Sequence, residues 1–99
     1  MNMQQMLMQA QKMQRELQKA QNELKAKEFT VSKGSAVTVI VMGDKSIKSI
    51  DIDKDAFDPE NKEMVEEMIA LAVNEAITQI EKESEEINER VTGRSGGLF

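Results

Sequence analysis

The stretch AVTVIVM, residues 36–42, is a β-branched run in which apolar side chains occupy both alternating faces. Residues of this kind favour the extended conformation, and a strand that is apolar on both faces is typical of the interior of a sheet. We therefore expect this run to be the central strand of a sheet, covered on both sides.

Two shorter extended segments flank this run. EFTVSK at 28–33 alternates apolar and polar residues, and SIKSIDID at 46–53 places two isoleucines on one face. Gly34-Ser35 and the GDK triplet at 43–45 supply the turns between them. Because both connections are short, the pattern predicts three antiparallel strands joined as a meander.

A helix is predicted on either side of this sheet. In residues 3–24 the apolar side chains recur at alternating intervals of three and four, which is the seam of a coiled-coil-like helix. The second helix is predicted to begin at Asp58-Pro59-Glu60, where a capping carboxylate precedes a proline and an acid. Helical spacing of apolar residues then continues as far as Val91.

The predicted fold class is α+β, in the order α-β-β-β-α, with a three-stranded antiparallel sheet and two long helices. The helices would be roughly 37 and 50 Å long, whereas the strands span only about 20 to 27 Å. The apolar stripes of the helices therefore extend past the sheet, and we expect a homodimer with protruding helical arms to cover them. Residues 1–92 are expected to form a single domain, followed by a flexible Gly-rich tail at 93–99.

The residues expected to pack between helices or in the dimer lie on these apolar seams and on the central strand. They are Met6, Met13, Leu17, Leu24, Val39, Val41, Ile69, Ile77 and Ile80. Met8 falls on the outward face of the first seam, and packing of that seam does not explain it.

Several classes of function are not expected. The chain contains neither Cys nor His, which removes thiol nucleophiles, the usual zinc sites and the commonest general base. DIDKD at 51–55 resembles the start of a calcium loop, but Ala56 and Lys62 stand where that loop needs Gly and Glu. The acidic run EKESEE at 81–86 is typical of a solvated helix face. We expect no enzyme activity, no cofactor, no metal site and no small-molecule substrate.

The sequence also gives an expectation about location. No apolar run approaches the length of about 18 to 20 residues that spans a membrane. The amino terminus lacks the charged and apolar regions of a secretory signal. A cytoplasmic protein without a membrane partner is therefore expected.

Charge is distributed unevenly along the acidic chain, whose formal net charge is -5. Residues 1–27 carry five basic and two acidic residues, whereas residues 60–99 carry four basic and ten acidic residues. The basic residues of the first segment are Lys12, Arg15, Lys19, Lys25 and Lys27. The first three follow helical spacing and line one outward stripe, and Lys25 and Lys27 extend the charge to the helix end, so all five are candidate contacts for an anionic partner. Such a stripe is either a solvated helix exterior or a surface that contacts the phosphates of an anionic partner.

The chain resembles the YbaB/EbfC family of bacterial nucleoid-associated proteins in several pieces that occur in the same order. The pieces are MQQMLMQAQKMQ at 3–14, GSAVTVIVMG at 34–43, SIDID at 49–53, KEMVEEMI at 62–69, AVNEAI at 72–77 and the Gly-rich tail. The likeness spans essentially the whole chain.

The resemblance implies a small homodimer in which sheets join the protomers and helices protrude. It also implies a cytoplasmic, nucleoid-located protein that binds double-stranded DNA with an architectural or regulatory role. Lys12, Arg15 and Lys19 would contact the DNA, helped by Arg90 and Arg94. The alternative is a dimeric helical adaptor that binds another protein and no DNA. Salt distinguishes the two, because phosphate contacts weaken steeply with salt and apolar contacts do not.

Overall fold

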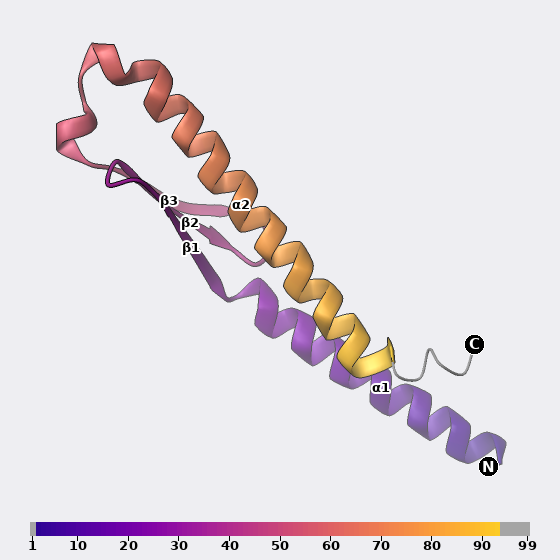
Figure 1. The fold of residues 1–99 in the computed structure, drawn as a ribbon. Coiled ribbons are helices and arrows are strands. Elements are labelled where there is room, and N and C mark those ends of the chain that lie inside the picture. Colours follow the sequence, from indigo (N-terminus) through magenta and orange to yellow (C-terminus); the bar gives the residue numbers. More distant parts are fainter. Residues whose placement is uncertain (1, 94–99) are drawn as a thin grey trace.

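The structure is a computed structural model that describes residues 2–93, so the tail at 94–99 lies outside the described residues (Figure 1). The predicted order of elements is confirmed. The elements are α1 (Met3–Lys25), β1 (Glu28–Lys33), β2 (Val37–Met42), β3 (Ile47–Ile52), the 3-10 helices η1 (Lys54–Ala56) and η2 (Pro59–Asn61), α2 (Lys62–Asn88) and the π-helical η3 (Glu89–Gly93).

The three strands form an antiparallel sheet in the order β1-β2-β3, with β2 in the centre as predicted. Val39 pairs with Val31 on one side and with Ile50 on the other, so these three side chains share one face. A shift of register at Ile40/Val41 bends the pairing between β2 and β3.

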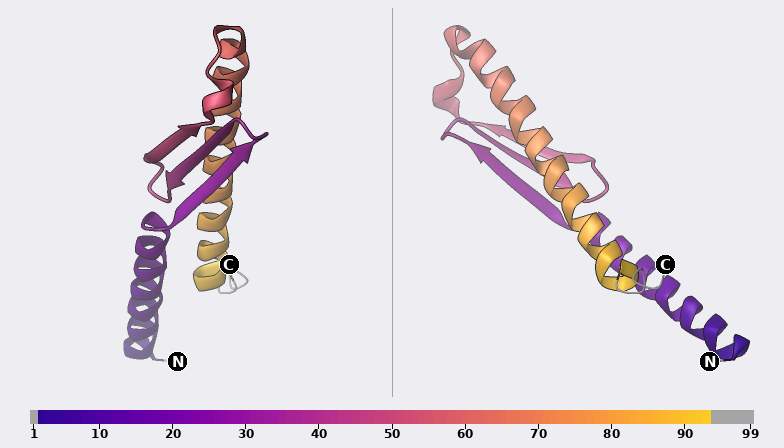
Figure 2. Two further views of the ribbon diagram at one scale, coloured as in Figure 1. Left: turned by 90° about the vertical axis from the view of Figure 1, so that its left-hand side faces the viewer. Right: turned by 45° about the vertical axis from the view of Figure 1, so that its right-hand side comes forward.

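One face of the sheet carries the core. Val37, Val39 and Val41 are buried there together with Ala72 and Ala76 of α2. The small side chains on α2 allow the helix backbone to approach the sheet closely. On the other face of β2 the alternate residues are only half-buried. The sequence pattern predicted that both faces of this strand would be covered, whereas the single chain fully covers only one. The reason is that α1 runs off the end of the sheet and does not fold across its second face (Figure 2).

The start of the second helix differs from the prediction in one detail. The Asp58 side chain accepts a hydrogen bond from the backbone N–H of Glu60 at 2.9 Å, and Pro59 occupies the first helical position. The turn that follows is a 3-10 helix, and the α-helix itself begins only at Lys62. The capping residues therefore nucleate a tighter first turn, which is frequent at helix N-termini.

The molecule is elongated because α1 protrudes. Its extents are 69 × 22 × 14 Å and its radius of gyration is 19.5 Å, against about 13 Å for a compact chain of this length. The C-terminal half of α1 packs beside the end of α2, where Leu17, Leu24 and Ile87 belong to the same apolar cluster. The N-terminal half continues beyond α2 as a single helix (Figure 1), and every one of residues 2–12 is exposed. We call residues 2–12 the distal arm.

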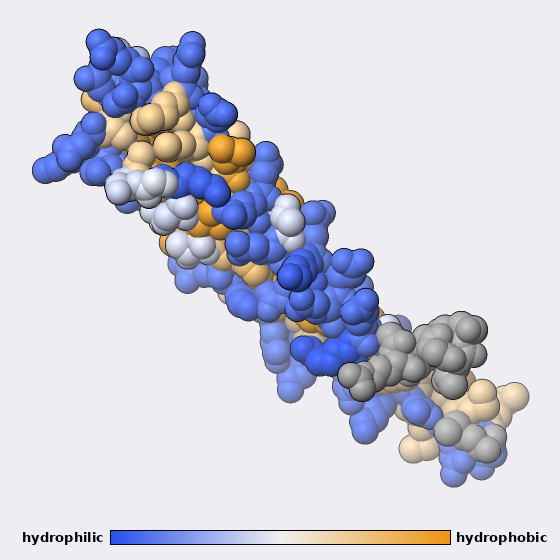
Figure 3. Space-filling view, in the orientation of Figure 1, coloured by the Kyte–Doolittle hydropathy of each residue, from blue (hydrophilic) through white to orange (hydrophobic). Residues whose placement is uncertain are grey.

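Large apolar side chains remain exposed on the distal arm, on β3 and around the start of α2, where Phe57 and Met64 lie. Figure 3 shows apolar surface at the end of the distal arm and near the start of α2. At the end of the distal arm, Met3, Met6 and Leu7 are exposed. Near the sheet, Ile47 and Ile50 of β3 are exposed because α2 lies over β1 and β2. Within the described residues, neither long helix has an apolar stretch sufficient to cross a membrane.

Candidate nucleic-acid interface

α1 is stabilised by its own sequence at its free end. Asn2 caps the helix by accepting the backbone N–H of Gln5 at 2.7 Å, and the Gln5 side chain accepts the backbone N–H of Asn2 in return. This capping box satisfies two helix-end donors that the distal arm could not satisfy by packing. Gln, Lys, Met and Ala, which favour the helical conformation, fill much of the following turns.

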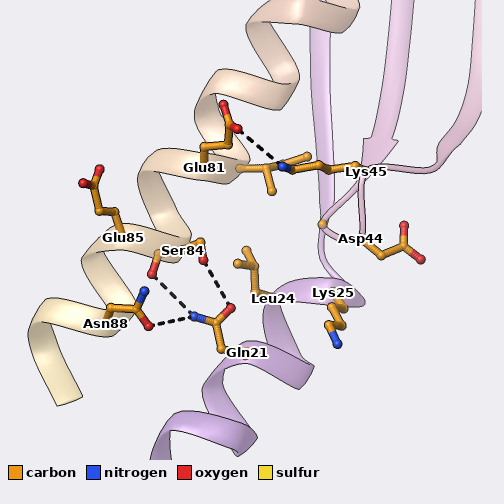
Figure 4. Close-up of a pocket in the computed structure, with 11 residues that line it drawn as sticks. Gln21, Leu24, Lys25, Asp44, Lys45, Glu81, Ser84, Glu85 and Asn88 are labelled. Carbon is orange, nitrogen blue, oxygen red and sulfur yellow. Dashed lines mark hydrogen bonds and ion pairs between the residues drawn. The ribbon is translucent and has the colours of Figure 1, made fainter. Parts of the chain in front are cut away.

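The other end of α1 is fixed to α2 by side-chain hydrogen bonds (Figure 4). The amide nitrogen of Gln21 donates to the backbone carbonyl of Ser84 at 3.5 Å and to the side-chain oxygen of Asn88 at 3.3 Å. The Ser84 hydroxyl donates to the amide oxygen of Gln21 at 3.3 Å. The three side chains set the orientation of α1 against α2, and the sequence pattern gave no signal for them.

A backbone contact completes the attachment of α1. Gly43, in the turn between β2 and β3, donates its N–H to the carbonyl of Lys27 at 2.9 Å. A Cβ atom placed on Gly43 would lie 1.7 Å from the backbone oxygen of Leu24, so only glycine fits this contact. Leu24 itself is 5% exposed and anchors the end of α1 in the core.

The turn that contains Gly43 is shaped by its neighbours. Lys45 adopts a positive φ of 72°, as the last residue of a three-residue hairpin loop commonly does. The hydroxyl and the backbone N–H of Ser46 donate to the Asp44 carboxylate at 2.5 and 2.9 Å, and these hydrogen bonds lower the pKa of Asp44. The charged carboxylate thus accepts both hydrogen bonds and ties the two ends of the turn together.

The predicted basic stripe lies on the face of α1 that is turned away from α2. Lys12, Arg15 and Lys19 are all exposed, and their spacing of three and four residues places them on one face of the helix. Leu17 and Leu24, which pack toward α2, lie on the opposite side of the same helix. We call Lys12, Arg15 and Lys19 the basic stripe.

The three residues of the basic stripe differ from most of the lysines elsewhere in residues 2–93, which form salt bridges with acidic side chains. Among residues 2–93 no salt bridge involves Lys12, Arg15 or Lys19. The ion pairs that do form are Lys27–Glu83, Lys33–Glu75, Lys45–Glu81, Lys48–Glu28 and Lys62–Glu66. The charges of the basic stripe are therefore available to an external anion.

The structure separates the remaining predicted contact residues from the basic stripe. Lys25 is exposed and lines the cavity beside the β2–β3 turn. Lys27 contacts Glu83 at 2.6 Å and lies 5.2 Å from the centre of the Phe29 ring, so its charge is engaged within the chain. Arg90 lines a hollow that it shares with Glu83 and Glu86 of α2. Arg94 lies outside the described residues.

The predicted packing residues also fall into separate groups. Leu24, Val39, Val41 and Ile80 are buried, and Met13, Leu17, Ile69 and Ile77 are half-buried. Met6, on the distal arm, is 57% exposed. Packing within one chain thus uses the inner part of the seam and leaves its outer end uncovered.

The cavity shown in Figure 4 has a volume of about 400 Å³ and lies between the end of α1, the β2–β3 turn and α2. Its lining mixes Lys25 and Lys45 with Asp44, Glu81 and Glu85. Lys45 is paired with Glu81 at 3.4 Å. Within residues 2–93 no group of three or more acidic side chains is placed to hold a metal ion. We therefore assign this cavity a structural role at the base of α1.

Comparisons with known proteins identify the family of the chain. The sequence model of the YbaB/EbfC DNA-binding family matches residues 1–95. A nucleoid-associated protein of Lactococcus lactis is 45% identical over 87 residues, covering 87% of this chain and 88% of that protein. One from Clostridium botulinum is 44% identical over 100 residues, covering 99% and 88%. One from Mycoplasmopsis pulmonis is 38% identical over 91 residues, covering 92% and 90%.

A crystal structure supports the fold independently. An uncharacterized protein from Helicobacter pylori matches with a TM-score of 0.74 over 91% of this chain and 96% of that chain. Its sequence identity is only 20%, so this likeness concerns the fold alone. The family match covers nearly the whole chain, including α1 with its basic stripe. The chain belongs to the YbaB/EbfC DNA-binding family.

Proposed function

We propose that this protein is a nucleoid-associated, homodimeric protein that binds double-stranded DNA mainly through phosphate contacts, with an architectural or regulatory role. The observation that carries the proposal is the basic stripe, whose three cations are exposed and unpaired within the described chain. Membership of a DNA-binding family and the names of the relatives support DNA as the anion.

The geometry of the basic stripe suits a phosphate backbone. Lys12 and Lys19 are separated by about 10 Å along the helix axis, at 1.5 Å per residue. Adjacent phosphates of one DNA strand follow one another at about 3.4 Å of duplex axis, so the stripe reaches several of them. Such contacts give affinity and orientation without reading sequence directly. An architectural protein needs this kind of binding.

The apolar surface beside β3 supports a second copy of the chain as partner. Ile47 is 49% exposed and Ile50 is 43% exposed, on the same face of the sheet as the core. Ile52 joins this face to the flank of α2, where Ile69 lines the same apolar hollow. We call Ile47, Ile50, Ile52 and Ile69 the β3 surface. A two-fold dimer that buries the β3 surface would complete the cover that α2 gives only to β1 and β2.

Replacement of Ile50 by aspartate is expected to convert the dimer to a monomer without unfolding it. The residue is half-exposed in the single chain, so a charge there costs little folding energy, but it would be buried without a partner in the dimer. Sedimentation equilibrium measures the mass. Leu71→Asp is the matched control, because Leu71 is 52% exposed on α2 and lies outside the β3 surface. Dimers of unchanged affinity for Ile50→Asp would contradict this interface.

One observation favours a second function, that of a protein-binding adaptor. The exposed side chains Met3, Met6 and Leu7 form an apolar end to the distal arm, and methionine suits adaptable peptide-binding surfaces. Residues 1–11 carry no charged side chain. An adaptor that binds through this end would show little dependence on salt, because its contacts release no counterions.

The test of DNA binding is fluorescence anisotropy of a labelled duplex, repeated over a series of salt concentrations. With three contacts from each arm of a dimer, log affinity should fall with log salt at a slope of about -5.4. A steep slope supports phosphate contact by the basic stripe. The absence of binding at low salt would contradict the proposal and leave the adaptor function as the better one.

A further inference from the structure

Met8 stands in line with the basic stripe. Positions 8, 12, 15 and 19 follow intervals of four, three and four residues, so Met8 extends the stripe by one turn toward the free end of α1. The side chain is 61% exposed. It lies about 140° around the helix from Met3, which belongs to the apolar seam. Met8 is therefore separate from the seam that packs α1 against α2.

Packing among residues 2–93 gives Met8 no role. The core cluster and the apolar residues packed against it include Leu17, Ala20 and Leu24 of α1 and no residue of the distal arm. An exposed apolar side chain in a row of unpaired cations is instead suited to a partner that has both anionic groups and apolar surface. Duplex DNA has both, in its phosphates and in the methyl groups of thymine.

The distal arm has the dimensions to reach those methyl groups. Its residues 2–12 are all exposed and, within the part of the chain that the structure describes, continue beyond α2 as a single helix, and an α-helix with its side chains is about 10 to 12 Å wide. The major groove of B-DNA is about 12 Å wide, whereas the minor groove, at about 6 Å, does not admit a helix. No acidic residue occurs before Glu16, so no carboxylate of the arm opposes its entry.

We propose that Met8 is a base-contacting residue whose side chain packs against thymine methyl groups in the major groove, giving the arm a preference for A·T-containing sites. The inference rests on the proposed DNA-binding function and adds sequence readout to it. Lys12, Arg15 and Lys19 hold phosphates at the groove edge, and Met8, one turn farther out, reaches the base edges. The flexible thioether side chain adapts to different positions of the methyl group.

The experiment compares two duplexes of the same sequence, one containing thymine and one containing uracil, which lacks the methyl group. Anisotropy titrations at fixed salt give the affinity of the wild-type protein and of Met8→Gln for each duplex. The wild type should bind the uracil duplex about four-fold more weakly for each arm whose Met8 buries one methyl group. Met8→Gln should bind both duplexes equally, with the salt dependence of the wild type.

Met3→Gln is the matched control, because it makes the same change at a residue that is 77% exposed on the other side of the helix. It should keep the wild-type preference for thymine. Equal, salt-dependent binding of both duplexes by the wild type would overturn the role of Met8 and leave the proposed function intact. A preference for thymine that survives Met8→Gln would also overturn it. No binding of either duplex at low salt would overturn both proposals.

Discussion

Replacing Lys12, Arg15 and Lys19 together by glutamine is expected to reduce affinity for duplex DNA by more than a hundred-fold at 0.1 M salt. Each phosphate contact contributes roughly eight-fold at that salt concentration through counterion release. The loss of the three contacts of one arm alone therefore corresponds to about five-hundred-fold, and the loss of all six contacts of a dimer to roughly 10⁵-fold. In a dimer both arms lose their contacts, and the slope of log affinity against log salt should become less steep by about 5.4.

The fold should survive this triple substitution. All three side chains are exposed, none forms a salt bridge within residues 2–93, and glutamine is a good helix former. Far-UV circular dichroism and sedimentation of the variant should therefore match those of the wild type. A loss of DNA binding can then be assigned to the missing charges.

The matched control changes the same number of charges elsewhere. Lys54, Lys62 and Lys82 are exposed and lie outside α1, so their joint replacement by glutamine gives the same net charge as the stripe variant. If long-range attraction by the whole molecule explained binding, the two variants would lose affinity equally. Equal losses, or retention of binding by the stripe variant, would contradict the assignment of the basic stripe as the DNA-contacting surface.

The sequence predicted the fold well because its local signals agree with one another. The β-branched run around Val39 and the turn at Gly43 identify the central strand and its hairpin, and both are confirmed. The regular seam through Leu17 and Leu24 predicted α1 and the face that it packs. The basic stripe follows from the same helical spacing, because a residue on an exposed helix has few alternatives for its direction.

What the sequence did not predict depends on contacts between distant segments. The hydrogen bonds of Gln21 with Ser84 and Asn88 join residues more than sixty positions apart, and polar residues of this kind have no periodic signature. The engagement of Lys27 by Glu83 is likewise visible only once α1 and α2 are placed together. The partial cover of the sheet depends on where α2 lies across it, which strand periodicity alone does not specify.

Gly43→Ala is expected to reduce the free energy of unfolding by about 3 kcal/mol, a large part of the stability of a domain this small. The new Cβ would lie 1.7 Å from the backbone oxygen and 2.6 Å from the carbonyl carbon of Leu24. A backbone group cannot rotate away as a side chain can, so α1 and the β2–β3 turn must separate. That separation also strains the hydrogen bond from Gly43 to Lys27 and withdraws Leu24 from the core.

Urea denaturation at one fixed protein concentration measures this loss, since the stability of a dimer depends on concentration. Gly34→Ala is the control, because Gly34 has a φ of +57° and a Cβ there would contact only Met68 at 3.7 Å and the backbone nitrogen of Ala36 at 3.9 Å. Its loss should be about 1 kcal/mol, the cost of a left-handed backbone for alanine. If Gly43→Ala cost no more than Gly34→Ala, the close contact would not hold the base of α1. The orientation of the basic stripe would then depend on the hydrogen bonds of Gln21 and on the packing of Leu17 and Leu24.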